Sequence, residues 1–140
     1  MRYLGLDLGT KTLGVALSDI TLTIASSYKT INFSENDYDS LVPEIDNLIK
    51  EFNIKKIILG LPKNMNNSLG ERAETTIEFK KLLEEKFNID VILQDERLST
   101  VEATNYMLES DISRKKRKKK IDALAATIIL QTYLNKERVK

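Results

Sequence analysis

The fold is decided near the start of the chain, in the stretch Leu4-Gly5-Leu6-Asp7-Leu8-Gly9-Thr10. Its leucines recur at every second position, which is the period of a β-strand and places them all on one face. Asp7 falls on the other face, between two glycines, and this bare patch would let a metal ion and a phosphate approach the sheet. An aspartate that only forms a turn at the strand end is the alternative. A charge within an apolar strand is costly to bury, which favours a functional role.

The rest of the chain alternates between strand and helix patterns. We expect strands over 1–8, 13–18, part of 21–33, 55–59 and 89–93, and helices over 38–52, 71–87, 99–109 and 121–134. This order, β-β-β-α-β-α-β-α-α, predicts an α/β fold in which helices cover both faces of a mixed five-stranded sheet. The length predicts that residues 1–140 form a single domain.

Composition excludes several classes of enzyme. The chain has no cysteine and no histidine, which removes disulfides, thiolate and imidazole zinc sites, and the Ser-His-Asp triad. Catalysis would therefore depend on carboxylates, lysines or hydroxyls, and carboxylates prefer hard cations such as Mg²⁺ or Mn²⁺. No apolar run approaches the ~20 residues that cross a bilayer, and the first residues do not resemble a signal peptide. We therefore expect a cytoplasmic protein without a membrane partner.

Two further acidic residues are candidates to join Asp7. Glu96 follows the strand expected at 89–93, and a parallel arrangement beside the first strand would bring it to the same carboxyl edge. A solvated strand end is the alternative there, and Asp95 is the competing acid because alternation sends it to the opposite face. Asp122 opens the last expected helix, whose alanines would let it lie close to the sheet. The alternative for Asp122 is an aspartate that the helix dipole favours.

Three carboxylates on three elements could hold two Mg²⁺ ions ~3.5–4 Å apart. One ion would activate a water for in-line attack on a phosphodiester, and the other would stabilise the leaving oxygen. The sequence therefore predicts a metal-dependent nuclease whose catalytic and metal-binding residues are Asp7, Glu96 and Asp122.

A dense basic segment suggests a polyanionic partner. Seven of the 22 basic residues are consecutive, whereas the acidic residues number 21 in the whole chain. Mutual repulsion predicts a mobile loop here, at the rim of the proposed site. Its contacts with nucleic acid would depend strongly on salt, and a merely solvated charge run is the alternative. Lys11 and Arg97 are weaker candidates for phosphate contacts. The seven residues are Arg114, Lys115, Lys116, Arg117, Lys118, Lys119 and Lys120.

Four motifs, at residues 5–16, 60–62, 95–100 and 122–126, occur in the order and spacing that resemble the YqgF (RuvX) family. The resemblance extends over essentially the whole chain. It implies a ribonuclease H-like fold, divalent-metal hydrolysis of phosphodiesters, and a role in maturing the 5′ end of pre-16S ribosomal RNA during ribosome biogenesis. It carries the acidic roles onto Asp7, Glu96 and Asp122. Thr12 stands where the family often has a basic residue, and this departure concerns one phosphate contact rather than the metal site.

Other readings compete with this one. The first motif also resembles the phosphate loop of actin-like and sugar-kinase proteins, but those close two lobes over ATP and this chain supplies one. A Holliday-junction resolvase acting on branched DNA, or a non-catalytic RNA-binding factor for ribosome assembly, would use the same basic segment. The expected partners are precursor ribosomal RNA or structured DNA and the small ribosomal subunit, for a monomer or a homodimer. Phosphate contacts do not distinguish RNA from DNA.

Overall fold

The computed structural model describes residues 1–9, 11–35, 37–61, 71–95 and 114–139. Within them a single sheet contains β1 (Arg2–Leu8), β2 (Thr12–Ser18), β3 (Ala25–Asn32), β4 (Ile54–Leu61) and β5 (Asp90–Asp95). The order across the sheet is β3-β2-β1-β4-β5. β2 is antiparallel to β1 and β3, whereas β4 and β5 run parallel to β1. The predicted mixed five-stranded sheet is confirmed.

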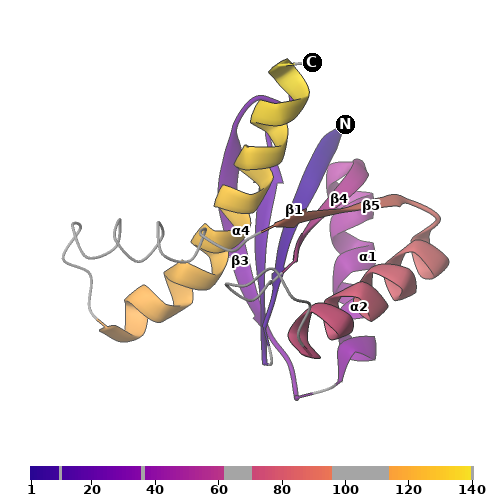
Figure 1. Cartoon of the computed structure of the whole chain (residues 1–140), viewed down its shortest axis with the longest axis vertical. Coiled ribbons are helices and arrows are strands. Elements are labelled where there is room, and N and C mark those ends of the chain that lie inside the picture. Colours follow the sequence, from indigo (N-terminus) through magenta and orange to yellow (C-terminus); the bar gives the residue numbers. More distant parts are fainter. Residues whose placement is uncertain (10, 36, 62–70, 96–113, 140) are drawn as a thin grey trace.

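Helices lie on both faces of this sheet, as predicted (Figure 1). A 3-10 turn, η1 (Tyr38–Ser40), leads into α1 (Leu41–Phe52), and α2 (Glu71–Phe87) follows β4. Both helices cover one face, and α4 (Arg114–Val139) covers the other. The helix expected at 99–109 lies outside the described residues. Of the described helices, none is long and apolar enough to span a membrane.

The alternation of side chains along β1 divides the interior into two apolar clusters. Leu4, Leu6 and Leu8 pack with residues of α1 and α2 in the larger cluster. Tyr3 belongs to a smaller cluster with Ala16, Ile58 and four residues of α4: Ala126, Ile129, Leu130 and Leu134. β1 is therefore the central strand of a three-layer structure, and its odd-numbered residues face α4.

The end of α1 shows how the chain enters the parallel part of the sheet. Asn53 adopts a left-handed conformation (φ 53°), and the backbone N–H of this helix cap bonds to the carbonyl of Ile49. Asparagine tolerates this conformation better than most residues, so the helix stops without strain. The next residue, Ile54, already belongs to β4 and is buried.

The last helix begins earlier than predicted. The basic segment 114–120, expected as a mobile loop, forms the first turns of α4. Lysine and arginine are good helix formers, and the apolar part of α4, which packs on the sheet, supplies the nucleus from which the helix extends. Asp122 consequently lies about two turns inside the helix and does not open it, so a favourable interaction with the helix N-terminus does not explain it.

Candidate active site at the carboxyl edge of the sheet

Asp7 lies one residue before the end of β1, on the sheet face that α4 covers. Its neighbours Leu6 and Leu8 are buried on the opposite face, so alternation directs the Asp7 side chain toward the α4 side. The side chain is half-buried there. The sequence-based face assignment for Asp7 is therefore consistent with the packing of its neighbours.

Four of the chain's five glycines surround Asp7. Gly5 and Gly9 flank it along the chain, and Gly14 of β2 is its cross-strand partner. On the other side Leu6 pairs with Leu59 of β4, and the next step of this parallel register sets Asp7 beside Gly60. A carboxylate with glycine on both neighbouring strands has no side-chain walls close to it within the sheet. Such a surface admits a cation or a phosphate close to the backbone.

The two lateral glycines were not recognised as part of the site from sequence. Gly14 had a local signal, because a tight hairpin that pairs Leu8 with Leu13 necessarily pairs Asp7 with Gly14. Gly60 had none, since its place beside β1 depends on a pairing between segments about fifty residues apart.

α4 crosses this face with its direction opposite to that of β1. Near the start of β1, Tyr3 contacts Tyr133 and Glu137 of the helix. At Gly5 an added Cβ would lie 3.0 Å from the carbonyl oxygen of Ala126, so helix and strand are in close contact there. From Gly5 to Asp7 the strand advances by about 6.6 Å, and from Ala126 back to residue 122 the helix covers about 6 Å in the same direction. This register brings the backbone of residue 122 level with Asp7.

β5, the strand that precedes Glu96, lies one strand further from β1 than expected. β5 pairs with β4 and not with β1, so β4 separates it from Asp7. β5 nevertheless runs parallel to β1, and its carboxyl end at Asp95 lies at the same edge of the sheet. Its residue Gln94 is buried and accepts a hydrogen bond from the Lys136 ammonium of α4 at 3.3 Å. Glu96 itself lies outside the described residues.

The predicted phosphate contacts are spread over three segments. Lys11 is exposed in the turn between β1 and β2, two residues after Gly9. Arg97 lies outside the described residues. The backbone of 114–120 precedes residue 122 in α4, so the register of the helix carries it beyond the carboxyl edge of the sheet.

The donor chemistry at this edge fits a hard divalent cation. Among the described residues no group of three potential metal ligands lies together. Asp7 is among those residues, whereas Glu96 and the side chain of Asp122 are not. A half-buried carboxylate at a glycine-lined strand end, without histidine or cysteine anywhere in the chain, suits Mg²⁺ or Mn²⁺ and not a softer metal.

Comparison with known proteins identifies the family of this chain. A family profile described as "RuvX: Holliday junction resolvase" matches residues 1–136. The chain belongs to the RuvX (YqgF) family. A relative from Bacillus subtilis with the name "Putative pre-16S rRNA nuclease" is 50% identical over 135 residues, which is 96% of this chain and 98% of that protein.

Solved structures show that this RuvX chain has the ribonuclease H-like fold of resolvases. RuvC of T. thermophilus in complex with a Holliday junction substrate superimposes with a TM-score of 0.63 at 13% identity, over 100% of this chain and 97% of that one. The Fowlpox virus resolvase in complex with Holliday junction DNA gives 0.61 at 16% identity, over 98% and 99% of the two chains. The predicted fold is confirmed.

Proposed function

We propose that this RuvX protein is a metal-dependent nuclease that matures the 5′ end of pre-16S ribosomal RNA, with Asp7, Glu96 and Asp122 as its catalytic and metal-binding carboxylates. One observation carries the proposal: the Asp7 carboxylate is half-buried among glycines at the carboxyl edge, and α4 brings residue 122 level with it. Residues 1–140 act as one nuclease domain in the cytoplasm.

Asp7, Glu96 and Asp122 would hold Mg²⁺ or Mn²⁺. Such ions, when bound, activate a water and stabilise the oxygen that leaves the phosphorus. Glu96 is preferred over Asp95 because Ile92 packs with the α4 cluster and Gln94 bonds to α4, so even-numbered residues of β5 face the same side as Asp7. The glycines beside Asp7 leave space for the phosphate backbone of the substrate.

The basic residues would hold the nucleic acid. Lys11 follows the strand that carries Asp7, Arg97 follows Glu96 in the sequence, and the helical backbone of 114–120 directly precedes the turn of α4 that contains residue 122. Phosphate contacts of this kind fix the position of the strand and release counterions. The helical backbone sets residues 114–120 at a fixed spacing from residue 122, which a mobile loop would not.

Two substrates follow from the comparisons. The relatives at about half identity carry a name that refers to pre-16S ribosomal RNA, which favours RNA. The family description refers to Holliday junctions, so branched DNA is the second candidate. The protein would act on the small ribosomal subunit or its precursor in the first case.

A cleavage assay distinguishes these possibilities. Wild-type protein is incubated with precursor 16S RNA that carries an unprocessed 5′ end, and separately with a four-way DNA junction, each with Mg²⁺, with Mn²⁺ or with a chelator. We expect metal-dependent cleavage of the RNA at its 5′ end. Asp7→Asn should abolish cleavage while the protein stays folded and still binds RNA.

Asp46→Asn is the matched control, because Asp46 lies on α1 and pairs with Lys50 of the next helical turn at 3.0 Å. This variant should cleave like the wild type. Cleavage of the junction alone would make the protein a resolvase. RNA binding without cleavage of either substrate would make it a non-catalytic assembly factor, and loss of fold in Asp7→Asn would make Asp7 structural.

A further inference from the structure

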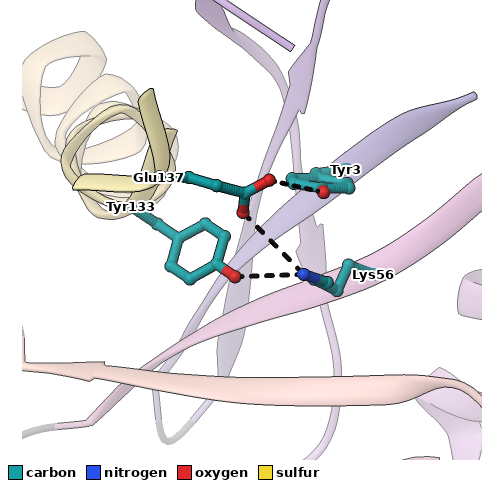
Figure 2. A network of polar contacts seen from close by, with 4 residues as sticks. All are labelled: Tyr3, Lys56, Tyr133 and Glu137. Carbon is teal, nitrogen blue, oxygen red and sulfur yellow. Dashed lines mark hydrogen bonds and ion pairs between the residues drawn. The ribbon is translucent and has the colours of Figure 1, made fainter. Parts of the chain in front are cut away.

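Four polar residues form a network at the edge of the sheet opposite the candidate site (Figure 2). The Tyr3 hydroxyl donates to Oε1 of Glu137 at 2.9 Å, and Nζ of Lys56 donates to the Tyr133 hydroxyl at 3.2 Å. Oε2 of Glu137 lies 3.8 Å from the same ammonium. The network joins β1 and β4 to the last two turns of α4.

The environment keeps Tyr3 and Lys56 in the protonation states that these contacts require. Burial raises the pKa of the Tyr3 hydroxyl, and its bond to Glu137 raises it further, so Tyr3 remains a donor. Burial by itself would lower the pKa of Lys56, but the hydrogen bond with Tyr133 and the charge interactions with Tyr133, Tyr3 and Glu137 together raise that pKa overall. The ammonium also lies 5.2 Å and 5.6 Å from the ring centroids of Tyr3 and Tyr133. Lys56 therefore stays charged between two aromatic faces.

Over β1 and β2 the remainder of the α4 interface is apolar, because Gly5 and Ala16 of the sheet meet Ala126, Ile129 and Leu130 of the helix. Toward β3 the Gln131 side chain of α4 makes two hydrogen bonds of 2.9 Å to backbone groups of the segment 23–25. Apolar burial has no direction, so the apolar contacts constrain the position of the helix along β1 less than the polar contacts do. Partly buried polar pairs, in contrast, are satisfied in one arrangement only, and fixing a register is their best-attested role.

We infer that Tyr3, Lys56, Tyr133 and Glu137 fix the register of α4 on the β1 and β4 side, as Gln131 does on the β3 side, and so hold the backbone of residue 122 level with Asp7. The inference rests on the proposed function. A slip of one helical turn would shift Asp122 by about 5.4 Å along β1, which is more than the separation of two metals that share carboxylates. The four residues are thus positioning residues that act on the site from the far edge of the sheet.

Metal affinity tests the positioning role without using activity. Tyr3→Phe combined with Glu137→Gln keeps both shapes but removes the hydroxyl donor and the negative charge. Titration with Mn²⁺ alone, well below the melting temperature, should show binding weakened about tenfold, the lower end of what loss of an orienting contact costs a metal site. Tyr3→Phe alone gives a milder change if the double variant does not fold.

A chemical crosslink tests the register itself. Ser27 Oγ and Thr127 Oγ1 are 2.8 Å apart, across the interface between β3 and α4. The chain has no cysteine, so Ser27→Cys with Thr127→Cys introduces one pair on a clean background. Oxidation should close this disulfide rapidly in an otherwise wild-type chain and slowly when Tyr3→Phe and Glu137→Gln are present, because a slipped helix separates the two sulfurs.

Ile45→Val is the matched control, since it loosens the packing of α1 on the opposite face. It should leave both Mn²⁺ affinity and crosslinking unchanged. Wild-type affinity in the network variant, or an equal loss in Ile45→Val, would overturn the inference. If the wild type binds no Mn²⁺, the proposed function fails, and the crosslinking rates alone then decide whether the network sets the register.

Discussion

Replacing Gly5 with alanine should disturb the contact that brings α4 onto β1. An added Cβ would lie 2.8 Å from Cβ of Leu130 and 3.0 Å from the carbonyl oxygen of Ala126. Favourable contact between carbon atoms starts at about 3.5 Å, so the helix must retreat by roughly 0.7 Å. Neither atom belongs to the flexible end of a side chain, so the helix itself has to move.

The cost follows from two opposing effects. Overpacking of this kind costs about 1–3 kcal/mol, and the lower entropy of the unfolded chain returns about 0.4–1 kcal/mol. We therefore expect Gly5→Ala to lower the free energy of unfolding by about 1–2 kcal/mol and the melting temperature by about 3–8 °C. A displacement of this size near reacting groups can cost up to ~10²-fold in rate, so cleavage should fall roughly ten- to a hundredfold.

Thermal denaturation followed by circular dichroism gives the stability, and cleavage of precursor RNA far below the melting temperature gives the rate. Ile45→Val should lose about 0.5–1.5 kcal/mol on the other face without loss of cleavage. Wild-type stability and rate in Gly5→Ala, or the same fall in cleavage in Ile45→Val, would refute the argument that close approach of α4 at Gly5 builds the site.

Three other predictions concern separate parts of the molecule. Ser18→Ala should lower the free energy of unfolding, measured by urea denaturation, by about 1–3 kcal/mol. The buried Ser18 hydroxyl accepts a hydrogen bond from the Tyr3 N–H at 2.8 Å, and its removal leaves that donor unpaired. A variant as stable as the wild type would contradict this. Hydrogen bonds from the Thr21 hydroxyl and from the N–H groups of Ile24 and Thr23 lower the pKa of Asp19 from 3.8 to about 2. The contribution of Asp19 to stability is therefore present above pH ~4 and is lost as the pH falls toward 2. Asp19→Asn should lose less stability than the wild type between pH ~4 and ~2 when the free energy of unfolding is measured against pH. An unchanged pH dependence would show that Asp19 is not responsible. Neutralising four lysines of the basic segment should weaken RNA binding, measured by fluorescence anisotropy, and should reduce the dependence of that binding on salt concentration. Unchanged binding would show that the segment does not contact RNA. The four residues are Lys115, Lys116, Lys118 and Lys119.

Much of the fold could be predicted because the signals are local. The leucine alternation in β1 defines both faces of the strand, and the apolar spacing in 38–52 and 71–87 defines two helices. The tight turn before Thr12 sets the hairpin. The prediction of a mobile loop over 114–120 is wrong, because repulsion between neighbouring cations is a local signal, whereas the helix that continues into this segment depends on packing further along the chain.

The sequence by itself determined the chemistry available to this protein. The chain has no histidine or cysteine, but it has a carboxylate in a central strand and a block of cationic residues, and these features indicate metal-dependent hydrolysis of a polyanion. Its motifs indicate the family. Tertiary structure decided what surrounds Asp7: Gly60 on one side, residue 122 level with it, and β4 between β1 and β5. These depend on pairings between segments far apart in the chain, and the side-chain pattern of any one segment is compatible with several such pairings.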